Sequence, residues 1–313
     1  MTVIRAEDKF LPQIPYTPFA QYAGSSILRE VVSRPLEGLG RNDIKLPVDG
    51  FVGHYTHDEK MKPVHLGVVS DTYELLQMRE LTDGAEAAMF DHFGGDPEIL
   101  DTVKVTDRSA RKGAWVRRSY QVDAFAEKID YREAGIKTGT TVAAKFDITT
   151  GFDGQTKTVL TCGLLDLVCD NGMVRMTDGD SVSRKHVKGT TADFFRTWMT
   201  DGMLKFADGI AEIRAMADSL VDPRAVDDVI KALPGMSERK AARMIQRVET
   251  EMQDRGRHAY AVLSAFTYYS SHDDIWFPVK KTGNDNVEDT LAARQAEVTK
   301  WVGSDAFKSL LAA

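Results

Sequence analysis

Cations and aromatic residues are interleaved in the segment RSARKGAWVRRSY, residues 108 to 120. If this segment is a strand, Trp115 and Arg117 share one face with Ser119, and Arg118 and Tyr120 share the other. Cations contact phosphates, and aromatic rings stack bases at about 1–3 kcal/mol each, so the pattern fits single-stranded nucleic acid. A solvated basic loop beside a core tryptophan would give the same pattern. The predicted DNA contacts of this segment are Arg111, Lys112, Trp115, Arg117, Arg118 and Tyr120.

A second basic cluster follows the segment LVCDNGMVRM, residues 167 to 176, which we interpret as a hairpin. Asp170, Asn171 and Gly172 tolerate the positive φ angles of a two-residue hairpin turn. Such turns close hairpins in unrelated proteins, so the turn alone predicts no function. The cations beside it are predicted to extend a nucleic-acid groove; they are Arg175, Arg184, Lys185 and Lys188.

Histidines and carboxylates also gather at two places that could hold a metal ion. One is HYTHDE, with His54, His57 and Asp58, and the other is SSHDD, with His272. Neither spacing is a known metal-binding signature, and turn-forming polar residues explain both equally well. We therefore expect no metal, and keep a metal-dependent nucleic-acid enzyme as an alternative hypothesis.

Motifs of the common enzyme classes are absent from the sequence. It has no glycine-rich dinucleotide loop, no phosphate-binding Walker loop, no serine elbow and no zinc-protease helix. Residues 232 to 245, ALPGMSERKAARMI, resemble a helix-hairpin-helix turn, but Ser237 replaces its second glycine, and we favour a helix capped by Ser237. We expect no cofactor and a protein that is not an enzyme.

Composition is that of an ordinary globular chain, with 313 residues, 42% hydrophobic and 28% charged. The net charge of −7 argues against a uniformly basic nucleic-acid binder and leaves local basic patches open. No apolar stretch is long enough to cross a membrane, and the first ten residues lack the apolar core of a signal peptide. We expect a cytoplasmic protein that contacts no membrane.

The pattern along the chain predicts an α+β protein in three parts. Residues 1–60 contain five prolines and lack periodicity, which predicts an extended N-terminal arm. Residues 61–189 predict an α+β core, with a strand and a helix followed by an antiparallel β-meander. Residues 190–313 have helical spacing and predict a helical subdomain.

Four segments together are similar to a family carried by phages, plasmids and integrated elements, known as domain of unknown function 932. They are LGVVSDTYELLQ (66–77), GAWVRRSYQV (113–122), GFDGQTKTVLTCGLLDLVCDNGMV (151–174) and AYAVLSAFTYYSSH (259–272). The apolar-Cys-x-Asn-Gly-Met hairpin is the most specific of these landmarks. The order of elements further resembles that of phage single-strand annealing recombinases, which form rings or filaments on single-stranded DNA and need no ATP.

This resemblance and the basic clusters lead to one principal expectation. The protein should bind single-stranded DNA as a homo-oligomer and assist recombination or replication of a phage or mobile element by strand annealing. A non-catalytic protein that binds a host factor is a further alternative, and it predicts that the basic clusters lie dispersed on the fold.

Overall fold

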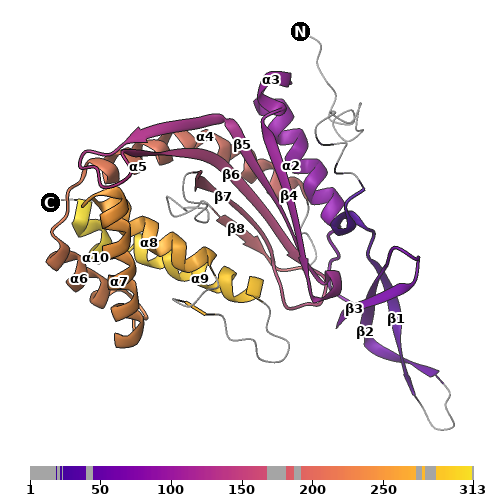
Figure 1. Cartoon of the computed structure of the whole chain (residues 1–313). Helices are drawn as coiled ribbons and strands as arrows, with labels where there is room; N and C mark the ends of the chain where they lie inside the picture. Colours follow the sequence, from indigo (N-terminus) through magenta and orange to yellow (C-terminus); the bar gives the residue numbers. More distant parts are fainter. Residues whose placement is uncertain are drawn as a thin grey trace.

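Two antiparallel sheets and a set of helices make up the structure, a computed structural model that describes residues 19, 22, 24–39, 45–167, 181–186, 192–272, 277–278 and 287–311 (Figure 1). One sheet has three strands and the other has five. The helices gather toward the C-terminus, and the fold class is α+β, as the sequence predicts.

The three-stranded sheet consists of β1 (Val32–Leu39), β2 (Lys45–His57) and β3 (Pro63–Ser70), in the order β1-β2-β3. An extended arm with only short local elements was expected here, but β2 alone is 13 residues long. The prolines are accommodated because Pro35 lies on an edge strand beside a register shift and Pro47 lies where β2 pairs only with β1. In Figure 1 this sheet projects from the end of the molecule opposite the C-terminal helices.

The five-stranded sheet is the predicted meander, with sequential strands side by side. The predicted strand and helix ahead of it are β3 and α2 (Met78–His92), which confirms their order. β5 and β6 are long, and a register shift between Val122 and Glu127 bends β5. The strands are β4 (Val103–Ala110), β5 (Trp115–Asp130), β6 (Gly139–Gly151), β7 (Thr158–Asp166) and β8 (Ser181–Arg184).

One face of the five-stranded sheet is covered by α2 and α4 (Ala192–Leu204), which also contact each other. Apolar residues at alternate strand positions, among them Val116, Phe146 and Leu160, meet Leu81 and Met199 of these helices. Alternation along a strand therefore sends one set of side chains into the core and the other set to the opposite face. The short helix α3 (Pro97–Leu100) leads into β4.

The C-terminal helices form the predicted helical subdomain around α8 (Ala259–Ser271), most of whose residues are buried. Its core is apolar and aromatic and includes Ile213, Phe266 and Trp301. Ser237 caps α7 by accepting a hydrogen bond from the backbone of Lys240, which confirms the capped helix. The other elements are α5 (Phe206–Asp218), α6 (Pro223–Ala232), α7 (Glu238–Arg255), α9 (Val287–Val302), α10 (Asp305–Lys308) and the 3-10 turn η5 (Ser309–Leu311).

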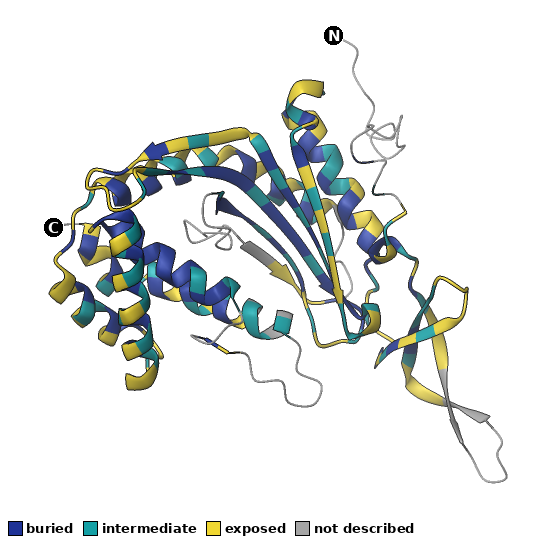
Figure 2. Ribbon diagram, viewed as in Figure 1, coloured by how far each residue is buried: buried dark blue, intermediate teal, exposed yellow. Residues whose placement is uncertain are grey.

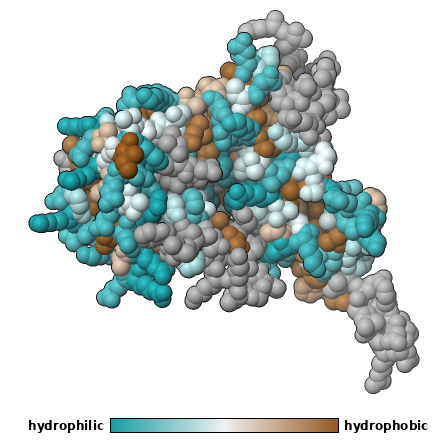
Figure 3. Space-filling model, viewed as in Figure 1, coloured by the Kyte–Doolittle hydropathy of each residue, from teal (hydrophilic) through white to brown (hydrophobic). Residues whose placement is uncertain are grey.

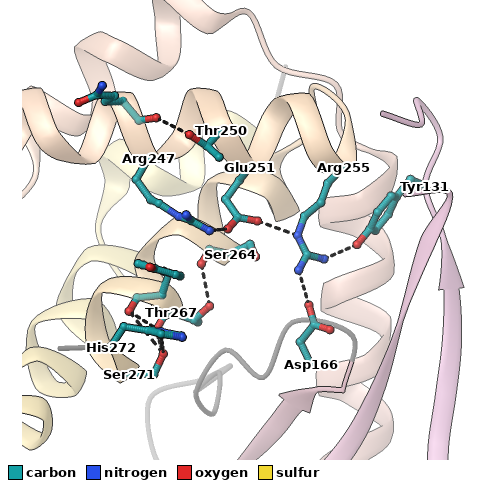
Figure 4. Close-up of polar contacts among 12 residues, drawn as sticks. Tyr131, Asp166, Arg247, Thr250, Glu251, Arg255, Ser264, Thr267, Ser271 and His272 are labelled. Atoms are coloured by element: carbon teal, nitrogen blue, oxygen red, sulfur yellow. Dashed lines mark hydrogen bonds and ion pairs between the residues drawn. The ribbon is translucent and has the colours of Figure 1, made fainter. Parts of the chain in front are cut away.

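A buried polar network joins this subdomain to the end of β7 (Figure 4). Arg255 is fully buried and pairs with Asp166 at 2.9 Å and with Glu251 at 2.8 Å. Asp166 also accepts hydrogen bonds from Tyr260 and from Thr140 of β6. Because the buried charges are paired and hydrogen-bonded, the network fixes the subdomain against the sheet.

A second buried cluster joins the two sheets. His54 of β2 donates from Nδ1 to the carbonyl oxygen of Phe152 at 2.7 Å, and Tyr73 donates to the carbonyl oxygen of Gly151 at 2.8 Å. The ring of Tyr73 stacks on that of His186, with centroids 4.6 Å apart. Burial lowers the pKa of both histidines, so this junction contains neutral imidazoles at neutral pH.

Candidate functional site

The face of the five-stranded sheet opposite α2 and α4 is polar. Strand register places Arg108, Arg117 and Thr149 side by side across β4, β5 and β6. Since directly paired residues of antiparallel strands share a face, the whole row can be followed across the sheet. We call this surface the polar face; its residues are Lys104, Thr106, Arg108, Arg117, Ser119, Gln121, Lys145, Asp147, Thr149 and Thr161.

Exposure of the polar face falls from the edge strand β4 toward β6 (Figure 2). The side chain of Lys104 is 66% exposed and pairs with Asp123, whereas that of Lys145 is 21% exposed. Arg117 lies between them, donates to the hydroxyl of Thr149 at 3.1 Å, and is partly exposed. Four cations therefore stand on the polar face with hydroxyl groups between them, accessible from the side of β4.

Asp147 is the one carboxylate at the register positions of the polar face, and its side chain is 5% exposed. Burial alone would raise its pKa, but Lys145 and Arg117, with the hydroxyl of Ser119 and then Arg108, outweigh burial and lower that pKa. Its Oδ1 lies 3.8 Å from Nζ of Lys145 and within hydrogen-bond distance of no described donor. Asp147 is thus ionised and partly neutralises the cations around it.

The structure corrects the predicted roles of Trp115, Arg118 and Tyr120, because all three are buried. Trp115 is 1% exposed, and the guanidinium of Arg117 lies 5.2 Å from its ring centre. A base cannot stack on a ring that is covered in this way. The predicted alternation of side chains along the strand is confirmed. The alternation did not predict which residues of the two faces are buried.

Arg118 points into the layer between β5 and α2, where it is 1% exposed. It makes two hydrogen bonds to Asp107, at 2.8 and 2.9 Å, and one to Glu86 at 3.1 Å. The hydroxyl of Tyr120 donates to the same Glu86 at 2.7 Å. Burial raises the pKa of Glu86 to about 7, although Tyr120 and Arg118 favour its ionised form. These residues hold the helix on the sheet and are unavailable to a phosphate.

Arg111 and Lys112 lie at the tip between β4 and β5, both with positive φ. The guanidinium of Arg111 pairs with Asp153 at 2.9 Å and donates to Gln155 and Thr156. Arg111 therefore ties this tip to the one between β6 and β7. Lys112 is exposed and stays a predicted phosphate contact.

Two residues of the second basic cluster, Arg184 and Lys185, are described, and Arg184 does not extend the polar face. Arg184 pairs in register with Thr158 and packs over Phe194 of α4, with its guanidinium carbon 4.1 Å from the ring centre, so it lies on the helix-covered side. Lys185 is exposed at the following position. Arg175, Lys188 and the predicted hairpin turn at Asp170 lie outside the described residues.

The residues of the metal hypothesis are not brought together. Asp58 accepts backbone hydrogen bonds from Lys60 and Lys62 within the turn that joins β2 and β3. His54 belongs to the junction of the two sheets, whereas His272 stacks on Tyr268 at the end of α8. Among the residues that the structure describes, no group of three or more histidine, cysteine, aspartate or glutamate side chains could hold a metal ion.

Lys104, Arg108 and Lys145 were missed as site residues. In TTVAAKFDITT, residues 140 to 150, Lys145, Asp147 and Thr149 recur at every second position, which on a strand places them on one face. That spacing was the available signal for β6. The spacing does not say which strands lie beside β6. The order and register of the strands bring β6 next to Arg117 and, one strand further, Arg108.

Fold and site together define an α+β protein with a cationic, hydroxyl-rich sheet face. The chain belongs to the family described as Domain of unknown function (DUF932), whose model matches residues 65–300. No curated protein and no solved structure matches the chain significantly. Among the described residues, no helix has both the length and the apolar character that a membrane span requires.

Proposed function

We propose that this protein binds single-stranded DNA on the polar face of its five-stranded sheet. The observation that supports the proposal is the placement of Lys104, Arg108, Arg117 and Lys145 on one face of adjacent strands. Cations in this arrangement neutralise successive phosphates and release counterions, while hydroxyl groups donate to phosphate oxygens. The binding needs neither a cofactor nor catalysis.

The open shape of the polar face favours a single strand. Its four cations lie on three adjacent strands, β4, β5 and β6, which span two intervals of about 4.8 Å, or about 10 Å. An open sheet face is a common platform for single-stranded nucleic acid because its flat surface follows an unpaired backbone.

The biological role that we propose is strand annealing during recombination or replication of a phage or mobile element, in the cytoplasm of the host cell. Pairing two complementary strands requires that both be held at once. We therefore propose that the protein acts as a homo-oligomer, in which each copy holds its strand on its own polar face. Family membership and the α+β architecture are compatible with this role.

Fluorescence anisotropy of a labelled oligothymidylate and of a duplex of equal length tests the binding. Between about 50 and 200 mM salt, affinity for the single strand should fall steeply, with a logarithmic slope of about −3 for four phosphate contacts. The single strand should bind more tightly than the duplex. No binding at the lower salt concentration would refute the proposal and would favour a protein partner instead.

Annealing and assembly are tested on the same sample. Two complementary labelled strands, mixed with the protein and without ATP, should pair faster than without it. Light scattering after size-exclusion chromatography should give a mass that is a multiple of the chain mass. If the protein binds DNA as a monomer and does not accelerate pairing, the proposed binding site stands and the annealing role is refuted.

A further inference from the structure

The three-stranded sheet has an aromatic surface on the side that faces away from the junction. Val69 and His54 are buried on the junction side, whereas Phe51 is 50% exposed and Val68 is 42% exposed. Register places Phe51 opposite Ser70 and Val68 opposite Gly53, so Phe51 and Val68 are diagonal neighbours on one face. Figure 3 shows hydrophobic residues at the surface of this projecting sheet.

The ring of Tyr55 lies flat along this surface. A Cβ atom at Gly53 would meet its ring carbon Cε2 at 2.7 Å, so the ring occupies the space above Gly53 and leans toward Phe51. The ring of His65 lies 5.0 Å from that of Tyr55, and the guanidinium carbon of Arg34 lies 5.6 Å from it. We call this surface the aromatic face; its residues are Arg34, Phe51, Tyr55 and His65, and Val68 is an apolar neighbour without a ring.

A cation borders the rings of the aromatic face. Arg34 is exposed and borders the rings. Positions 32–35, 51–57 and 63–70 contain one arginine, three histidines and no carboxylate, whereas the rest of β1 and β2 adds Glu37 and the exposed Asp49, two residues before Phe51. Rings at the surface beside a cation are the chemistry that proteins use to stack unpaired bases.

We infer that the aromatic face stacks the bases of single-stranded nucleic acid, through the rings of Phe51 and Tyr55, with Arg34 at the backbone. This inference rests on the proposed function and assigns base contacts to a different sheet from the phosphate contacts. It also accounts for the lack of any exposed ring among the predicted stacking residues, since Trp115 and Tyr120 are both buried.

Substitution Phe51→Ala tests the inference, with Val68→Ala as the matched control. Both side chains are exposed on the same face, and only one has a ring. Affinity is measured by anisotropy for an oligothymidylate and for an abasic strand with the same number of phosphates. Wild type should prefer the strand with bases, and Phe51→Ala should reduce that preference by about fivefold or more, as expected for one lost stacking contact. Val68→Ala should leave the preference unchanged.

A second variant, Phe51→Trp, gives a spectroscopic signal at the site. Its emission, compared with that of wild type, should be quenched by the oligothymidylate and not by the abasic strand. Equal binding of both strands by wild type, or an unchanged preference in Phe51→Ala, would overturn the inference while the proposed function stands. A loss of oligomer mass in Phe51→Ala with an unchanged preference would also overturn it, since the face would then bind a second copy. Failure of wild type to bind either strand would overturn both proposals.

Discussion

The two sheets of this molecule use similar residues in opposite ways. In the five-stranded sheet the rings of Trp115 and Tyr120 are buried, and the exposed face carries cations and hydroxyl groups. In the three-stranded sheet the rings of Phe51 and Tyr55 lie on the outer face, and His54 lies on the buried side. Tyr120 is buried because α2 and α4 pack on its side of the larger sheet, whereas Trp115 lies on the polar side, where the guanidinium of Arg117 lies over its ring. No described helix packs on the aromatic face.

We propose that the two sheets divide two functions that a single sheet face often combines. Phosphate contacts require cations held apart by neutral polar groups, as on the polar face. Base stacking requires exposed rings, as on the aromatic face.

Neighbouring arginines on the two faces of β5 should behave differently. Arg118→Ala leaves Asp107 and Glu86 without their buried guanidinium and should lower the free energy of unfolding by about 3–5 kcal/mol. Arg117→Ala removes a partly exposed cation and should cost less than about 1 kcal/mol. Urea unfolding of the two variants, followed by circular dichroism, measures both. Equal losses of unfolding free energy in the two variants would contradict the assignment of a buried and an exposed face to β5.

Glycines on the two sides of the three-stranded sheet provide a second contrast. A Cβ atom at Gly67 would lie 2.6 Å from Cα of Asp153, so Gly67→Ala should force the sheets apart and cost about 1–3 kcal/mol. At Gly53 the three atoms nearest to the added methyl all belong to the side chain of Tyr55, which can rotate. Gly53→Ala should therefore be less destabilising in urea but should reduce the preference for strands with bases. Greater destabilisation by Gly53→Ala would contradict this assignment of faces.

The junction between the sheets should weaken in acid. Burial lowers the pKa of His54 and His186 below 6.5 in the folded protein, so the unfolded chain binds more protons as the pH falls below about 6.5. The stability that these groups contribute is present above pH 6.5 and is lost on acidification, by about 1.4 kcal/mol for each unit of pKa shift. Urea unfolding between pH 7.5 and 5, compared with His54→Gln, should give a shallower pH dependence in the variant. Identical pH dependence in wild type and variant would show that His54 contributes no pH-dependent stability to the junction.

The carboxylate on the polar face should limit its affinity for DNA. Asp147→Asn removes a negative charge beside Lys145 and Arg117 and should strengthen binding at low salt by about 1 kcal/mol, or roughly fivefold. Anisotropy with the oligothymidylate measures the change, and a melting curve checks that the variant is folded. Weaker binding by a folded variant would mean that Asp147 itself contacts the ligand.

Much of the fold could be predicted from local patterns. Alternation predicted the antiparallel meander, and the 3.6-residue period predicted α2 and the C-terminal helices. The three-stranded sheet was missed because Pro35 and Pro47 are read locally as breaks in a strand. Both prolines are tolerated only because their positions lack a partner strand on one side. The local sequence does not show which positions lack a partner, because this depends on how distant segments pair.

The candidate site was predicted only in part for a related reason. Alternation placed Arg117 and Arg118 on opposite faces, but the packing of α2 against β5 decides which face is buried. The same packing turned the expected stacking residue Tyr120 into a core residue. Lys145 could not be joined to Arg117 from the sequence, because their proximity depends on the register between β5 and β6.

The central claim is that the polar face binds the phosphates of single-stranded DNA, and a triple variant tests it most directly. Arg108→Ala, Arg117→Ala and Lys145→Ala combined remove three of its cations, whereas Arg224→Ala, Lys231→Ala and Lys308→Ala remove three exposed cations from the helical subdomain. Both variants change the net charge equally. Anisotropy against salt should show that the slope of the first variant is shallower by about 2 and that the second resembles wild type. Equal slopes in all three proteins would contradict the claim.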